Sequence, residues 1–65
     1  MTRIKQVKDL QSGDRLSDGT EIIGRPLELT HTPKGKMEVA IRYPNGTKRA
    51  VLWGKYTTLF MAHNS

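Results

Sequence analysis

The sequence predicts an all-β protein, a single domain over residues 1–65 with about five short antiparallel strands in meander order. The first observation behind this is the spacing of turns. Segments rich in Gly, Asp, Asn and Pro recur with runs of about five to ten residues between them, which is typical of hairpins. The second is alternation, because apolar residues occupy every second position from Met37 to Tyr43. Closing so small a sheet removes its exposed edges, so we expect a closed or half-open barrel.

The clearest predicted element is a hairpin made of residues 36–43 and 47–54. Between them lies Asn45-Gly46, a strong signal for a two-residue turn because both positions tolerate positive φ. Such a turn pairs Pro44 with Thr47 and fixes the register of the whole hairpin. The register predicts a core face of Met37, Val39, Ile41, Tyr43, Ala50 and Leu52. It predicts an outer face of Lys36, Glu38, Ala40, Arg42, Arg49, Val51, Trp53 and Lys55.

A third strand is predicted before this hairpin. In Thr32-Pro33-Lys34-Gly35 the proline suits the second position of a type I turn, and the glycine suits a left-handed position after it. A three-residue loop there puts Leu27 and Leu29 on the predicted core face and His31 beside that face. We therefore expect a three-stranded meander.

The first half of the chain predicts shorter elements. Residues 3–7 read as a strand with Ile4 in the core, and residues 7–10 as an ordered turn that buries Leu10. Asp18-Gly19 predicts a hairpin turn flanked by residues 15–16 and 20–23.

The end of the chain predicts a closing element. Tyr56-Thr57-Thr58 predicts a one-turn 3-10 helix before the last strand, and residues 59–62 predict that strand. His63-Asn64-Ser65 is expected to be a frayed tail.

Several of these segments together resemble the SH3-like small barrels. The resemblance rests on the stretch from Val7 to Leu16, on the Asp18-Gly19 turn, and on the stretch from Trp53 to Phe60. The chain is also similar to short uncharacterised reading frames of actinobacteria and their phages. The resemblance implies an SH3-like barrel and a protein that is phage-encoded.

The composition favours acidic partners. The net charge is +5 and the isoelectric point is near 10, which suits nucleic acid, an anionic surface or an acidic protein patch. The absence of cysteine excludes a disulfide scaffold, a thiolate zinc site and a cysteine nucleophile. No apolar run has the length of a membrane span and no signal peptide is recognised. We expect a complete small cytoplasmic protein, nucleoid-associated if it binds DNA, with no membrane partner.

The predicted outer face is the candidate nucleic-acid-binding surface. Arginine and lysine neutralise phosphates, and an exposed tryptophan among them can stack on or wedge between bases. Small archaeal chromatin proteins with SH3-like barrels bind duplex DNA through a similar triple-stranded face, a likeness of architecture alone. The residues predicted to bind, with low sequence specificity and duplex DNA preferred, are Lys36, Arg42, Lys48, Arg49, Val51, Trp53 and Lys55.

Two acidic residues keep a second function open. Glu28 and Glu38 fall on the same predicted face and argue against a uniform phosphate-binding surface. The alternative is a small interaction module that docks on an acidic surface of a host or partner protein and modulates it. A face covered by a loop or by the C-terminal segment is the third possibility.

The sequence predicts no enzyme, no metal, no cofactor and no small-molecule substrate. His31 and His63 share no metal-ligand spacing with a carboxylate. Asp14 and Asp18 could place two carboxylates on one rim, which is an acid–base arrangement, but Asp beside Gly is also the ordinary composition of a turn.

Overall fold

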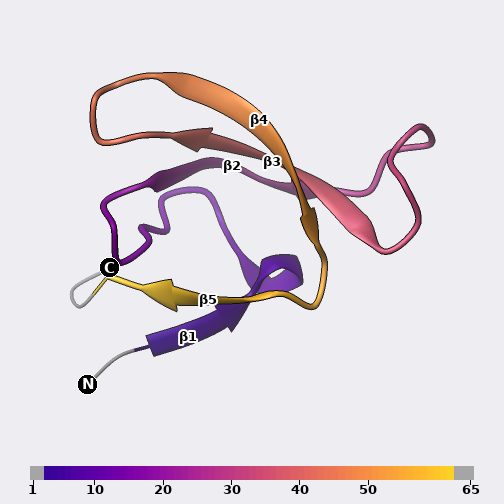
Figure 1. Ribbon diagram of the computed structural model, residues 1–65, viewed down its shortest axis with the longest axis horizontal. Coiled ribbons are helices and arrows are strands. Elements are labelled where there is room, and N and C mark those ends of the chain that lie inside the picture. The colour runs from indigo at the N-terminus through magenta and orange to yellow at the C-terminus, as the bar shows by residue number, and fades with distance from the viewer. Residues whose placement is uncertain (1–2, 63–65) are drawn as a thin grey trace.

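The computed structural model describes residues 3–62, and this part of the chain is all-β (Figure 1). It holds five strands and one turn of 3-10 helix, in two antiparallel sheets. The elements are β1 (Arg3–Gln6), η1 (Val7–Asp9), β2 (Glu21–Leu27), β3 (Lys36–Arg42), β4 (Lys48–Gly54) and β5 (Thr58–Met61). The predicted all-β class is confirmed. The tail predicted at residues 63–65 lies outside the described residues.

The larger sheet is the predicted meander of three strands, in the order β2-β3-β4. β3 and β4 pair without interruption from Lys36↔Gly54 to Arg42↔Lys48. The pairing of β2 with β3 is less regular, because the register shifts on both sides of Gly24. This sheet forms the upper layer in Figure 1.

The smaller sheet pairs β1 with β5, the two ends of the described chain. The segment after η1 joins it to the larger sheet: Leu16 bridges Met61 of β5, and Arg15 bridges Glu21 of β2. At the other end, the N–H of Lys8, which follows β1, donates to the carbonyl of Lys55, which follows β4, at 3.0 Å. The two sheets are therefore tied together by backbone hydrogen bonds at both ends.

One core lies between the sheets. Leu10 is buried there, as predicted from the ordered turn at residues 7–10, and Val7 is buried in the same core. The buried apolar side chains among the described residues are Val7, Leu10, Leu16, Ile22, Val39, Ile41 and Met61. Ile4 was expected in this core and is 56% exposed, because it pairs with Phe60 on the solvent side of the smaller sheet.

The hairpin of β3 and β4 differs by one residue from the predicted register. Its loop has three residues, since the N–H of Tyr43 donates to the carbonyl of Thr47 at 2.8 Å. In a two-residue turn the donor to the carbonyl of Thr47 would be the N–H of residue 44, and Pro44 has no N–H. Gly46 takes the left-handed position with φ 92°, completing a turn followed by a bulge.

A one-residue shift exchanges the two faces of β4. Val51 now pairs with Val39 and Trp53 with Met37, so both side chains pack against the core. Ala50 and Leu52 point to solvent instead, and the predicted core position of each was wrong.

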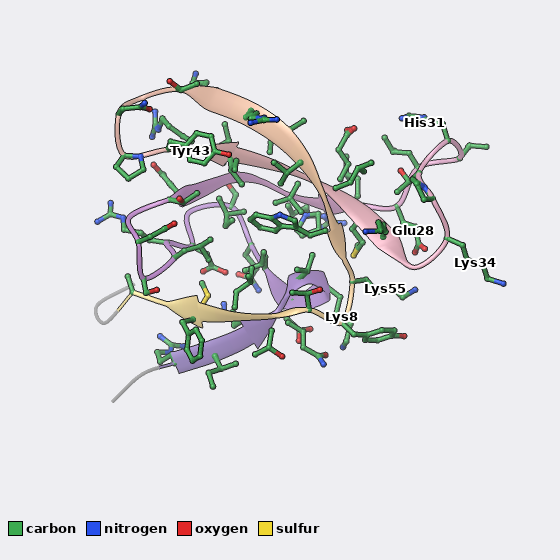
Figure 2. The ribbon with its side chains drawn as sticks, viewed as in Figure 1. Lys8, Glu28, His31, Lys34, Tyr43 and Lys55 are labelled. Atoms are coloured by element: carbon green, nitrogen blue, oxygen red, sulfur yellow. The ribbon has the colours of Figure 1, made fainter. Side chains whose placement is uncertain are left out.

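The register predicted between β2 and β3 was also wrong. β2 ends at Leu27, which pairs with Glu38 and faces solvent. The chain turns directly afterwards, because the hydroxyl of Thr32 accepts a hydrogen bond from the N–H of Leu29 at 3.1 Å. Leu29 and His31 lie exposed in this loop, and Figure 2 shows His31 at its outer end.

The 3-10 turn lies at the opposite end of the sequence from its predicted place. Val7–Asp9 form it, closed by a hydrogen bond from the N–H of Leu10 to the carbonyl of Val7. The segment predicted to be helical holds a β-turn, in which the N–H of Thr57 donates to the carbonyl of Gly54 at 3.0 Å. The Asp18-Gly19 turn is confirmed by the bond from the N–H of Gly19 to the carbonyl of Leu16.

Candidate binding surface on the three-stranded sheet

The solvent side of the β2-β3-β4 sheet, here called the outer face, follows from the observed register. Residues that pair across the strands share a face, and those paired with buried side chains define the opposite one. The outer face carries Glu21, Gly24, Leu27, Lys36, Glu38, Ala40, Arg42, Lys48, Ala50 and Leu52.

The middle of the outer face is largely apolar, with the carboxylate of Glu38 between its two leucines. One cross-strand row holds Leu27, Glu38 and Leu52, and each leucine is 48% exposed. The next row consists of small residues, Gly24, Ala40 and Ala50. No large side chain of this row therefore covers the leucines. We call the two leucines and the three small residues the apolar patch. These two half-exposed leucines make the apolar patch a candidate surface for contact with another molecule.

A charged row borders the apolar patch at the end nearer the β3–β4 turn. Arg15, Glu21, Arg42 and Lys48 are successive partners across four segments of chain. Nη2 of Arg42 lies 2.6 Å from Oε1 of Glu21. This hydrogen bond, the charge of Arg42 and the charge of Arg15 lower the pKa of Glu21. The row contains three cationic side chains and one carboxylate, so its net charge is positive.

The structure divides the residues predicted to bind nucleic acid between two faces. Lys36 and Arg42 lie on the outer face, as predicted, and Lys48, which the predicted register paired with Tyr43, lies there too. Val51 and Trp53 lie on the core side, so no tryptophan stands exposed among the cations. Arg49 pairs with Ile41 on the core side as well, where its side chain is exposed.

Lys55 lies beyond β4 and is engaged within the protein. Its Nζ lies 3.6 Å from Oε1 of Glu28 and 5.6 Å from the centre of the Tyr56 ring. Figure 2 shows Lys55 and Glu28 at the end of the sheet away from Tyr43. Lys55 therefore holds the end of β4 against the loop after β2.

Several cations form no ion pair within residues 3–62. Lys34 and Lys36 lie at one end of the hairpin, and Lys48 and Arg49 lie at the other. Six strand steps at about 3.4 Å put the two ends about 20 Å apart. The complete set of described cations without an ion pair is Arg15, Arg25, Lys34, Lys36, Lys48 and Arg49.

The two carboxylates considered for acid–base chemistry have structural partners. Asp14 accepts hydrogen bonds from Nζ of Lys5 at 2.9 Å and from the N–H of Gln11 at 3.0 Å. Burial alone would raise the pKa of Asp14, but these bonds together with the charges of Lys5 and Arg3 lower it. Asp18 accepts the N–H of Thr20 at 2.9 Å, and this bond lowers the pKa of Asp18. Both groups fix turns as ionised carboxylates.

Sequence reasoning missed the exposed leucines, which are the central feature of the surface. A two-residue turn at Asn45-Gly46 predicts a core position for Leu52. The signal that could have found it is Pro44, since a proline cannot donate the closing hydrogen bond of the hairpin.

Comparison with known proteins finds no matching family model, no matching curated protein and no matching solved structure. The resemblance to SH3-like barrels and to actinobacterial and phage reading frames therefore stays a prediction from the sequence. Among the described residues, no helix has the length and apolar character needed to cross a membrane.

Proposed function

We propose that the protein is a non-enzymatic, cytoplasmic docking module that binds a partner protein through its outer face. The observation that carries this proposal is the apolar patch with charged residues on either side of it. Protein interfaces commonly have an apolar centre that excludes water and a polar rim. Leu27 and Leu52 are each 48% exposed and suit such a centre.

The charge of the surface suggests the chemistry of that partner. Lys36 lies beyond the leucine row at one end, and Arg15 and Lys48 lie beyond the small-residue row at the other. With a net charge of +5, the protein is attracted to acidic surfaces over a Debye length of about 8 Å at physiological salt. The partner is therefore expected to carry an apolar centre with carboxylates around it.

We also propose that the two sheets form an SH3-like small barrel. The meander of β2, β3 and β4 and the pairing of β1 with β5 support this architecture. So do the hydrogen bonds from the N–H of Ser17 to Phe60 and from the N–H of Lys8 to Lys55, which join the sheets at both ends.

Matched surface variants test the docking proposal. The tagged protein is incubated with a nuclease-treated lysate of the source cells, beside a Leu27→Ser, Leu52→Ser variant and an Ile4→Ser, Phe60→Ser control. The control removes apolar area of the same kind from the other sheet, where Ile4 is 56% and Phe60 59% exposed. We expect a protein that the wild type and the control retain and the outer-face variant loses. Equal retention by all three proteins would contradict the proposal.

Duplex DNA binding is the second candidate function. It is favoured by the unpaired cations Lys36, Lys48 and Arg49 on one hairpin. About three phosphate contacts give a log–log salt slope near −2.7, or about a 40-fold loss of affinity between 50 and 200 mM salt. Trp53 emission should not change on binding, because the indole packs against the core. If nuclease treatment abolishes what the tagged protein retains from the lysate, and binding to duplex DNA shows that salt slope, DNA would be favoured over a protein partner.

A further inference from the structure

β4 leaves one of its two backbone edges without a partner. Two hydrogen bonds at the ends of the β3–β4 ladder show which residue pairs are hydrogen-bonded. They run from the N–H of Tyr43 to the carbonyl of Thr47 and from the N–H of Lys55 to the carbonyl of Gly35. In an antiparallel pair, successive residues direct their N–H and C=O alternately toward the partner and away from it. Lys48, Ala50 and Leu52 therefore direct theirs away from β3.

Nothing in the described chain covers this edge. No hydrogen bond reaches the backbone of Lys48, Ala50 or Leu52 from outside the β3–β4 ladder. All three residues are exposed, and Figure 1 shows the first half of β4 along the rim of the molecule. Three donors and three acceptors are thus open over five residues, a length of about 14 Å.

The other edges lack this combination of length and regularity. β1 and β5 have four residues each, and β2 contains Pro26 and two register shifts. Prolines, irregularities, short strands and charged side chains are the usual means of keeping an edge from pairing, and β4 has only the last of these, at Lys48 and Arg49. β4 has seven residues in unbroken register, with no proline and no bulge.

We propose that this edge accepts an extended acidic segment of the partner protein as an additional antiparallel strand. The proposal rests on the docking function above and adds how the partner is held. Main-chain hydrogen bonds would supply affinity, and side chains at alternate positions would supply specificity.

The side chains of β4 predict which residue types the added strand would carry at each position. Its residues opposite Leu52 and Ala50 would lie on the outer face and extend the apolar patch, which favours apolar side chains. Its next two positions would lie opposite Arg49 and Lys48, which favours carboxylates. The expected pattern is apolar, any, apolar, acidic, acidic, in the direction from N to C.

Charge decides between this occupant and a second copy of the chain. Two copies pairing at β4 would bring together two molecules of charge +5, with Lys48 and Arg49 of both at the new interface. An acidic segment neutralises the same two side chains.

Backbone methylation of a probe peptide tests the proposal directly. The probe is the blocked peptide Leu-Thr-Val-Glu-Glu, whose first, third and fifth N–H groups would face β4. N-methylation at the third residue should weaken binding about tenfold or more, because it removes one donor and crowds the ladder. N-methylation at the fourth residue, whose N–H faces away, is the matched control and should leave the affinity within about twofold.

Amide hydrogen exchange of the intact protein gives the second readout. Without peptide, the amides of Arg49, Val51 and Trp53 should exchange slowly and those of Ala50 and Leu52 quickly. Bound peptide should slow exchange at Ala50 and Leu52. Equal effects of the two methylations, or no slowing at these amides, would overturn the proposal. If exchange at these amides slows as the protein concentration rises in the absence of peptide, a second copy of the chain covers the edge and the proposal is overturned.

Two variants separate this proposal from the docking function. Ala50→Pro removes an N–H that β3 does not use, and Ala50→Ser keeps it. We expect Ala50→Pro to lose both the probe and the partner and Ala50→Ser to keep both. If Ala50→Pro keeps the partner while the Leu27→Ser, Leu52→Ser variant loses it, the outer face docks the partner without strand addition.

If Ala50→Pro does not fold, a Lys48→Glu, Arg49→Glu variant should prefer a probe ending in two lysines, and an unchanged preference would overturn the proposal.

Discussion

Trp53 and Tyr56 lie three residues apart in opposite surroundings. Trp53 pairs with Met37 and packs against the core, whereas Tyr56 is 63% exposed in the turn after β4. Trp53→Ala should therefore lower the free energy of unfolding by about 2–3 kcal/mol. Tyr56→Ala should lower it by less than about 1 kcal/mol, since it removes only an exposed ring near Lys55. Urea unfolding followed by far-ultraviolet circular dichroism measures both, and equal losses would contradict the placement of Trp53.

The carboxylate of Asp14 gives the protein an acid-sensitive contact. Its partners Lys5 and Gln11 lower the pKa of Asp14 below the usual value of 3.8. A carboxylate with a lowered pKa stabilises the folded state above its unfolded pKa, and the contribution is lost as pH falls through the folded value. Stability should thus decline below about pH 4. Asp14→Asn should reduce this decline, as should Lys5→Met, when urea midpoints at about pH 7 and pH 2.5 are compared. An unchanged acid dependence in both variants would exclude the contact as its cause.

At the scale of single elements, the β3–β4 hairpin shows what the sequence could and could not predict. The strand of Lys36–Arg42 and its inward residues were predicted correctly, because alternation depends on one strand alone. The faces of β4 were not, because they depend on loop length, and one residue reverses them. Pro44 is the signal for the longer loop, because its missing N–H removes one of the two closing bonds of a two-residue turn.

The β2–β3 connection could not be predicted from local signals. Gly35 takes positive φ, 83°, as expected, yet the chain also turns at residues 29–32 through the hydroxyl of Thr32. Pairing on β2 is displaced further by the shifts around Gly24. These features depend on contacts across the sheet, so the exposure of Leu27 had no signal within its own strand.

Adjacent lysine substitutions on β4 test which face each residue occupies. Val51 packs against the core and Leu52 is 48% exposed. Val51→Lys should cost about 1–3 kcal/mol of unfolding free energy, because the ammonium must leave the core side. Leu52→Lys should change the unfolding free energy by no more than about 0.5 kcal/mol. Chemical denaturation of the two variants compares them directly. The register predicted from Asn45-Gly46 alone requires the opposite order.

The whole molecule is expected to unfold as one unit, because both sheets share a single core. Leu16 pairs with Met61 of the smaller sheet and is buried with Ile22 of the larger one. Leu16→Ala should cost about 2–4 kcal/mol. In a domain of this size that lowers the midpoint of thermal unfolding by about 10–25 °C. Near- and far-ultraviolet circular dichroism should report the same midpoint, and two separate transitions would show that the sheets unfold independently.

The binding surface of the whole molecule depends on the register of β3 against β4. That register turns Trp53 inward, exposes Leu52 and places Ala50 at the centre of the apolar patch. In an antiparallel ladder the Cα hydrogens approach most closely at the pairs without hydrogen bonds, where the Cα atoms lie about 4.5 Å apart. The observed alternation makes Ala40–Ala50 and Glu38–Leu52 such pairs.

Nuclear Overhauser effects between Cα hydrogens therefore test the central claim most directly. The structure predicts strong effects between Ala40 and Ala50 and between Glu38 and Leu52. Strong effects between Ile41 and Ala50 and between Val39 and Leu52 would instead establish a two-residue turn, return Trp53 to the solvent side and remove the apolar patch.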